Sequence, residues 1–231
     1  MLIKEPTNDG ERKLFQLQKW TGVDVIITVL LVDCVYFVYF LRFQYNILQS
    51  LPADYLYFII LIIIILLFRL KFKTNLFDLG FVNSNGRIAV VAGLIVALVG
   101  VVIVYALYYS LGKPRSYTYY FVEETKFLRT TIDWLQFFIF SVFVAPVVEE
   151  ILYRGVLYSP YRKRYGSTAA IIITSVLFSV SHFGLSFLST FIGGILLAIL
   201  YEKTESLISP IIAHVAFNLI NITTLLVIQR Q

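Results

Sequence analysis

The chain has 231 residues, of which 59% are hydrophobic and only 14% are charged, and its net charge is +5. Soluble domains carry about 25% charged residues, so this composition excludes a water-soluble globular fold and makes the lipid bilayer the expected solvent. The basic residues lie in short linkers between apolar segments, as in membrane proteins with positively charged cytoplasmic loops. We therefore do not expect nucleic-acid binding.

Two features of the polar residues exclude further classes. Cys34 is the only cysteine, so a disulfide within the chain and a thiolate zinc site are both excluded. Residues 1–20 are polar and of mixed charge, and they lack the apolar stretch of a signal peptide. We predict that they form a cytoplasmic tail.

The remainder, residues 21–231, is predicted to be a single all-α domain, a polytopic transmembrane helical bundle. A membrane-spanning helix needs about 20 apolar residues. We expect about seven spans, within a range of six to eight because the second is short. They are 22–41, 55–68, 88–109, a segment beginning near 134, 167–181, 185–201 and 207–228.

The charged linkers predict the orientation of these spans. Basic clusters occur in the tail, between residues 69 and 87, and at residues 162–164, whereas the linker 113–133 is mixed in sign. With seven spans and a cytoplasmic N-terminus, all three basic clusters fall on the cytoplasmic side, where lysine and arginine are enriched. The predicted location is therefore the cell membrane, in a multi-pass arrangement.

The fourth predicted span contains two adjacent carboxylates. Ionisable residues inside a membrane are costly and indicate function. Arg154 follows Glu150 by four residues, so the two share a helix face and can neutralise each other. Glu149 lies about 100° around the helix and lacks that partner. A carboxylate of this kind suits a general acid or base.

The fifth span ends with Phe178 and His182, which share a helix face. Glu149 lies 17 residues before Gly166 and His182 lies 16 residues after it. If the chain turns at Gly166, both positions lie about 24 Å along antiparallel helices and come level. Phe178 is expected to pack beneath the imidazole.

The seventh span carries His214 and Asn218, again four residues apart on one helix face. Pro210 falls in its first turn, where proline is tolerated. In the sixth span, Gly193 and Gly194 are expected to let a neighbouring helix approach closely.

Each of these features also has a structural explanation. Glu150 and Arg154 alone can be a structural ion pair, and one histidine or asparagine in a membrane helix is often an interhelical hydrogen-bonding group. The convergence of all of them favours a reactive site.

The motif set resembles that of the CPBP family, which comprises CAAX proteases and bacteriocin-processing enzymes and is also called the Abi family. Three motifs occur in order: Glu149-Glu150-x-x-x-Arg154, Phe178-x-x-x-His182 and His214-x-x-x-Asn218. The surrounding "APVVEEILYRGVLY" and "SVLFSVSHF" resemble the family too. The resemblance covers about residues 134–221, with a small addition from "LFDLGF" at 76–81.

The resemblance implies an intramembrane endopeptidase without a metal or other cofactor, acting on membrane-embedded or membrane-anchored peptides, with or without a lipid. It implies that Glu149 and His182 activate water, and that His214 and Asn218 stabilise the oxyanion. Glu150 and Arg154 would orient the site. The sequence does not define the oligomeric state.

Three alternatives stay open. A zinc protease could use Glu149, His182 and His214 as ligands, although the chain contains no HExxH motif. A non-catalytic protein that binds a membrane partner, or a bacteriocin-immunity protein, would use the polar cluster for packing. A transporter could relay protons through it, but the sequence shows no inverted repeat.

Overall fold

The computed structural model describes residues 24, 53–73, 79–81, 86–110, 125, 128, 130–180, 182 and 187–229. Every regular element within this part of the chain is a helix, which confirms the all-α prediction there. The tail and, apart from Asp24, the first predicted span lie outside the described residues.

The predicted spans correspond closely to the observed helices. Segments 55–68, 88–109, 167–181, 185–201 and 207–228 were expected, and the fourth span was expected to begin near 134. The observed elements are α3 (Ala53–Phe72), α4 (Gly86–Ser110), α6 (Thr131–Ile139), η1 (Phe140–Val144), α7 (Ala145–Glu150), η2 (Ile151–Tyr158), α8 (Ser159–Tyr165), α9 (Ser167–Val180), α10 (Phe187–Thr204) and α11 (Ile208–Gln229).

Three helical stretches within the described residues are long and apolar enough to cross a membrane. They are Val90–Leu107, the continuous helical stretch Thr131–Tyr165 and Phe187–Thr204, and Ser167–Val180 and Ile208–Thr224 are shorter apolar helices. The chain is accordingly a helical membrane protein. The face of α4 that carries Leu98 and Val102 is exposed, as lipid contact requires.

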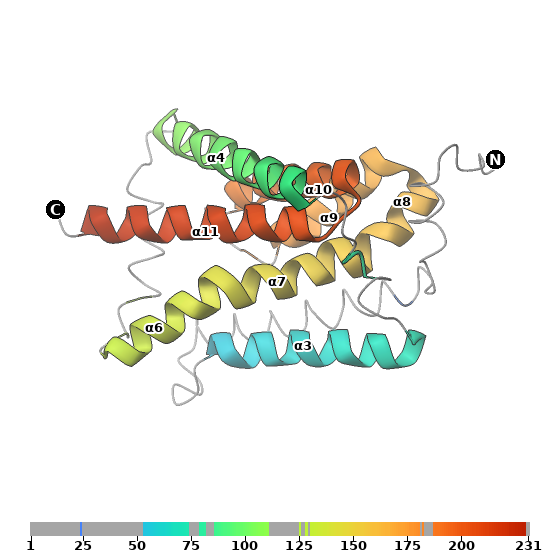
Figure 1. The fold of residues 1–231 in the computed structure, drawn as a ribbon, viewed down its shortest axis with the longest axis horizontal. Coiled ribbons are helices and arrows are strands. Elements are labelled where there is room, and N and C mark those ends of the chain that lie inside the picture. The colour runs from blue at the N-terminus through green and yellow to red at the C-terminus, as the bar shows by residue number, and fades with distance from the viewer. Residues whose placement is uncertain are drawn as a thin grey trace.

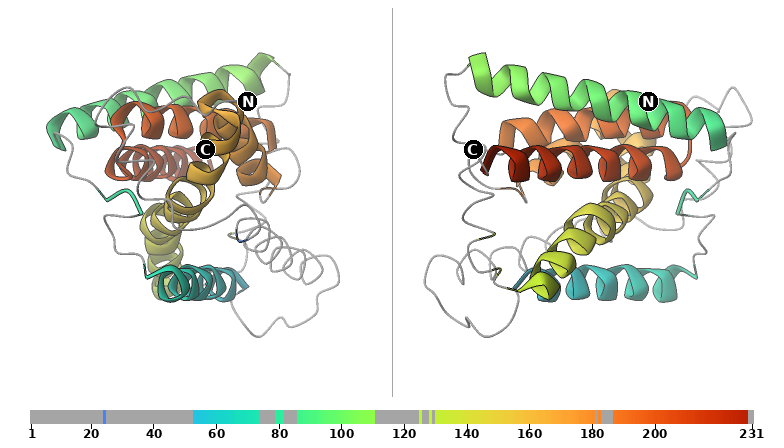
Figure 2. Two further views of the ribbon diagram at one scale, coloured as in Figure 1. Left: turned by 90° about the vertical axis from the view of Figure 1, so that its right-hand side faces the viewer. Right: turned by 60° about the vertical axis from the view of Figure 1, so that its left-hand side comes forward.

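The helices form a bundle around the long element that runs from α6 to α8. In Figure 1 this element crosses the molecule diagonally, with α4, α10 and α11 on one side and α3 on the other. Figure 2 shows the same separation from two further directions. α11 packs extensively along α4, α9 packs along α10, and α3 touches α7 and η2.

The long element begins at a fully formed cap. The Thr130 side chain accepts a hydrogen bond from the Asp133 amide, and the Asp133 carboxylate accepts one from the Thr130 amide. This reciprocal arrangement is a capping box, and it satisfies amides that the first helical turn leaves without partners.

Two π-helical segments interrupt the long element, and each segment ends two residues before a proline. η1 ends at Val144, before Pro146, and η2 ends at Tyr158, before Pro160. Proline lacks an amide hydrogen, and its ring clashes with the carbonyl four residues earlier in an α-helix. A widened turn lets the helix continue past each proline. The sequence analysis did not predict these π turns, although the prolines were their visible signal.

The chain reverses at Gly166, the turn on which the comparison of depths in the sequence depends. Gly166 has a φ of +85°, a conformation that glycine adopts without the steric cost that a Cβ atom imposes. It separates α8 from α9 and allows the two helices to run side by side in opposite directions.

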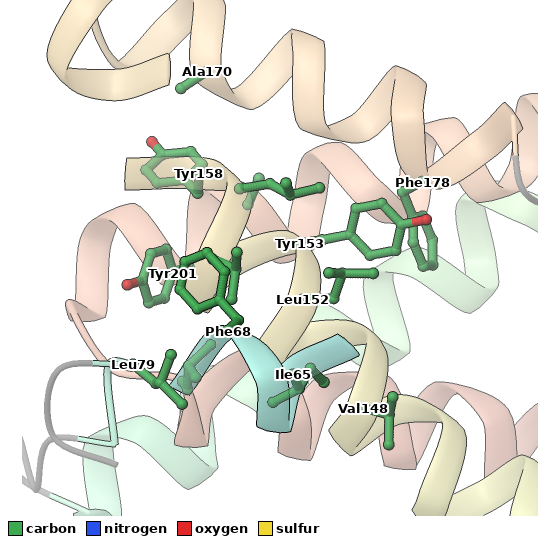
Figure 3. Close-up of a cluster of buried hydrophobic side chains, with 14 residues drawn as sticks. Ile65, Phe68, Leu79, Val148, Leu152, Tyr153, Tyr158, Ala170, Phe178 and Tyr201 are labelled. Atoms are coloured by element: carbon green, nitrogen blue, oxygen red, sulfur yellow. The ribbon is translucent and has the colours of Figure 1, made fainter. Parts of the chain in front are cut away.

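The main core lies between the long element, α3, α9 and α10. Figure 3 shows aromatic and aliphatic side chains from these helices packed together, among them Phe68, Tyr153, Phe178 and Tyr201. Burial of such side chains against neighbouring helices fixes the helices relative to one another.

A short segment outside the helices, residues 79–81, is inserted into this core. Leu79 is 1% exposed, and the Leu207 amide donates to the Gly80 carbonyl at 2.8 Å. A Cβ atom on Gly155 would lie 2.9 Å from the Leu79 carbonyl oxygen. This segment is the described end of the "LFDLGF" stretch, and glycine at 155 lets its backbone reach the long element.

Candidate active site

Glu149 and Glu150 lie in the last turn of α7, and Arg154 lies one turn further in η2. All three are buried, with Glu150 and Arg154 completely inaccessible to solvent. Arg154 Nη1 donates to Glu150 Oε1 at 3.0 Å. The i,i+4 spacing thus forms the ion pair that it indicates in the sequence. In a low-dielectric interior, such a pair requires good geometry to offset its desolvation cost.

Arg154 also connects the long element to α10. Its Nη2 donates to the Gly194 carbonyl at 2.9 Å, and its guanidinium lies over the Phe178 ring, 5.2 Å from the centroid. A guanidinium over an aromatic face is attracted by the ring quadrupole. Arg154 therefore holds three helices together around the carboxylates.

His214, on α11, bridges the two carboxylates. Its Nδ1 lies 2.9 Å from Glu150 Oε1, and its Nε2 lies 3.7 Å from Glu149 Oε2. Because Arg154 stabilises Glu150 as a carboxylate, Nδ1 is the natural donor in the first contact, a protonation state assigned from the hydrogen-bond pattern. The second contact is longer than a hydrogen bond.

The His214 imidazole is therefore a basic group beside Glu149. The sequence indicated only that Glu149 does not share a helix face with Arg154. The two nitrogens of an imidazole lie on different sides of the ring, so one histidine can face both adjacent carboxylates. Glu149 and His214 are each 6% exposed, so neither is isolated from the surface of the bundle.

The Phe178 ring contacts both imidazoles. Its ring centroid lies 4.8 Å from that of His182 and 5.7 Å, edge to face, from that of His214. His182 Nδ1 lies 2.8 Å from the Phe178 carbonyl oxygen. The three motifs singled out in the sequence therefore come together, with the Phe178 ring in contact with groups from all three.

The helix containing Phe178 packs closely against α10 at one glycine. A Cβ atom on Gly194 would lie 3.2 Å from Ser175 and 3.3 Å from the Phe178 ring. The prediction of close packing is confirmed for Gly194. It does not hold for Gly193 within the described residues, where a Cβ atom would meet no atom within 4 Å, because adjacent helical residues point in different directions.

Asn218 lies one turn beyond His214, and its amide is engaged in the structure. Its Nδ2 donates to the carbonyl of Ser141 in η1 at 2.8 Å. An amide nitrogen carries two hydrogens, so one N–H of Asn218 is occupied and the second is left for another acceptor.

Asn221 continues the same face of α11, seven residues after His214, and sequence reasoning missed it. It is 6% exposed, and its side-chain oxygen is buried without a hydrogen-bond partner in the described part of the chain. The i, i+4, i+7 spacing of His214, Asn218 and Asn221 was the signal that could have found it.

Within the described residues, no three histidine, cysteine, aspartate or glutamate side chains are grouped so that they could hold a metal ion. The site consists of a carboxylate and an imidazole at 3.7 Å, fixed by a second carboxylate and an arginine. This chemistry can bind and deprotonate a water molecule.

The segment that carries this site also matches a family of known proteins. Residues 131–220 match the family model described as type II CAAX prenyl endopeptidase Rce1-like. Over this segment, the match supports the resemblance to the CPBP family. The matched segment contains Glu149, Glu150, Arg154, Phe178, His182, His214 and Asn218, and it ends one residue before Asn221.

A curated relative is "Putative membrane peptidase YdiL" of Bacillus subtilis (strain 168), which is 29% identical over 118 residues. The alignment spans 48% of this chain and 48% of the relative, so it covers about half the length of each protein. No solved structure matches the chain.

Proposed function

We propose that this chain is an intramembrane endopeptidase that hydrolyses peptide bonds with a water molecule activated by Glu149. The observation that carries the proposal is the position of Glu149: buried, with Oε2 3.7 Å from His214 Nε2. His214 is itself fixed from the opposite side by Glu150, whose charge Arg154 balances. A water molecule beside the line between the two atoms can contact both, as is common across such gaps.

In the proposed reaction, the Glu149 carboxylate accepts a proton from water while the oxygen attacks the peptide carbonyl carbon. His182 assists Glu149, the role that the family resemblance implies. The carbonyl oxygen becomes an oxyanion in a tetrahedral intermediate. The Glu149 carboxyl then gives its proton to the departing amine, which restores the carboxylate and leaves a free acid and an amine.

The oxyanion needs hydrogen-bond donors. A doubly protonated His214 would donate through Nδ1 to Glu150 and through Nε2 to the oxyanion, and the second N–H of Asn218 is a further donor. Loss of one such donor typically lowers kcat by about a hundredfold to a thousandfold. Glu150 and Arg154 would act indirectly, by fixing His214 and the helices that carry the site.

The proposed topology has seven spans, the N-terminus in the cytoplasm, and residues 21–231 as one transmembrane domain. One observation supports the direction of its C-terminal spans. Arg154 contacts Gly194 and Arg162 contacts Glu202, and both pairs are 40 residues apart. Because the residue numbers of the contacting partners increase together, the long element and α10 run in the same direction. The fourth and sixth spans of a bundle whose spans alternate in direction must do so.

This topology indicates the substrate class. The site residues would be reached from the cytoplasmic half of the bilayer, so the substrates would be membrane-embedded or membrane-anchored peptides, lipidated or not. No nucleic acid, metal or other cofactor takes part in the proposed reaction.

The test is cleavage of membrane-anchored peptides by the purified protein in lipid vesicles, read by mass spectrometry. We expect cleavage by the wild type, and a fall in kcat of about a hundredfold to ten-thousandfold in Glu149→Gln, the range for loss of a general acid–base group. Glu205→Gln, in the turn between α10 and α11, is the matched control and should cleave normally.

Two outcomes would contradict the proposal. Normal cleavage by Glu149→Gln would show that this carboxylate is not the base, and loss of cleavage with a strong chelator would favour the zinc alternative. A cellular phenotype that Glu149→Gln retains in full, without any cleavage, would favour the partner-binding alternative.

A further inference from the structure

The carbonyl of Ser141 lacks the two backbone donors that a helix normally offers, and Pro146 accounts for one of them. A helix carbonyl accepts from the amide four residues later in an α-turn and five residues later in a π-turn. For Ser141 these are Ala145 and Pro146. The Ala145 amide donates to the Phe140 carbonyl instead, and proline has no amide hydrogen.

Asn218 provides the missing donor. Its Nδ2 lies 2.8 Å from the Ser141 carbonyl oxygen, 77 residues away in the sequence. The bond is partly buried, and a carbonyl shielded from water without a donor is costly, so this bond is favoured whenever the two helices are packed. The bond fixes the amide plane of Asn218, and with it the direction of the second N–H.

We propose that Pro146 is a positioning residue for Asn218. By withholding one backbone hydrogen bond, it exposes a carbonyl that holds the Asn218 side chain in the orientation needed to donate to the oxyanion. This inference rests on the proposed function for its catalytic consequence, but the bond itself can be measured independently of activity.

The decisive variant is Pro146→Ala, which supplies an amide hydrogen that can compete for the Ser141 carbonyl. We expect kcat to fall by about tenfold to a hundredfold, because small misplacements of catalytic groups have effects of this size. KM should stay within twofold. The thermal midpoint should not fall, because alanine removes the proline ring from a helix interior.

Pro160→Ala is the matched control, since Pro160 stands in the same relation to η2 as Pro146 does to η1. Its kcat should equal that of the wild type. If Pro146→Ala also keeps its kcat within twofold, or if both variants lose activity equally, Pro146 has no specific role and the proposal is wrong.

A double-variant cycle tests the route of the effect. In an Asn218→Ala background the amide is absent, so adding Pro146→Ala should produce no further loss of kcat. An additional tenfold loss in that background would mean that Pro146 acts by another route, which would overturn the proposal.

Nuclear magnetic resonance of the Asn218 side-chain amide separates this inference from the proposed function. In the wild type, one of the two hydrogens should exchange slowly with solvent and the other quickly. Pro146→Ala should abolish the difference and Pro160→Ala should keep it. Two fast-exchanging hydrogens in the wild type would overturn the inference even if Pro146→Ala fails to fold. An absence of cleavage with the slow hydrogen present would count against the proposed function alone.

Discussion

The long element carries two arginine–carboxylate clusters that both join it to α10, and they differ in how completely they are satisfied. At its end, Arg162 Nε donates to the Glu202 carboxylate, 2.9 Å from the nearer oxygen, and Tyr158 donates to the same group at 2.8 Å. At the site, Glu150 Oε2 and Arg154 Nε are buried without a hydrogen-bond partner in the described part of the chain.

The difference separates a clamp from the proposed reactive centre. The Glu202 cluster is partly accessible, since the Arg162 side chain is 14% exposed and the Glu202 side chain is 17% exposed. Each oxygen of the Glu202 carboxylate accepts a hydrogen bond. The Glu150 carboxylate is inaccessible and accepts its two hydrogen bonds, from Arg154 and His214, on the same oxygen. Incomplete satisfaction of buried polar groups is costly and is retained where function requires it.

The largest effect on stability should come from breaking the inaccessible pair. Arg154→Met leaves the Glu150 charge buried without its main partner, which typically costs about 3–5 kcal/mol of unfolding free energy. Reversible unfolding in mixed micelles would measure it. The double variant Glu150→Gln/Arg154→Met should recover part of the loss, because it leaves no uncompensated charge. A loss below about 1 kcal/mol for Arg154→Met would mean that the pair is not buried as described.

A smaller effect should follow from filling the close contact beside the site. Gly194→Ala places a Cβ atom 3.2 Å from Ser175, and overpacking of this kind costs about 1–3 kcal/mol. The adjacent Gly193→Ala has open space around its Cβ atom and should be neutral or slightly stabilising, since alanine is the better helix former. Unfolding of the two variants under identical conditions compares them directly. Equal destabilisation would contradict the packing described for α10.

How far the sequence predicts this molecule depends on the kind of feature. The helices were predictable because apolar runs of spanning length have few other solutions in a bilayer. The i,i+4 pairs and the turn at Gly166 predicted that Glu149, His182, His214 and Asn218 would surround one cavity. The structure places His214 beside Glu149, and Phe178 against both His182 and His214. These signals are local in the sequence. Because consecutive spans run in opposite directions, residues at equal distances from a turn come to the same depth in the membrane.

Other features required the coordinates. The bridging of both carboxylates by His214 depends on the rotation of α11 about its own axis, which no local pattern gives. The engagement of Asn218 with Ser141 depends on a π turn, and the apolar periodicity of the sequence does not indicate that one-residue widening. Gly193 and Gly194 look equivalent in sequence, yet among the helices that the structure describes only Gly194 faces a close neighbour.

The smallest effect should come from the clamp. Glu202→Gln keeps an acceptor for Tyr158 and Arg162 but removes the charge, so we expect a loss of about 1 kcal/mol in unfolding free energy, within the range for one hydrogen bond. Peptide cleavage should be unchanged, since the clamp lies eight residues beyond Arg154 on the long element and eight beyond Gly194 on α10. Measuring unfolding and kcat on the same preparation tests both statements. A fall in kcat without a loss of stability would mean that the two clusters are coupled along the parallel helices and that the distinction between clamp and reactive centre is wrong.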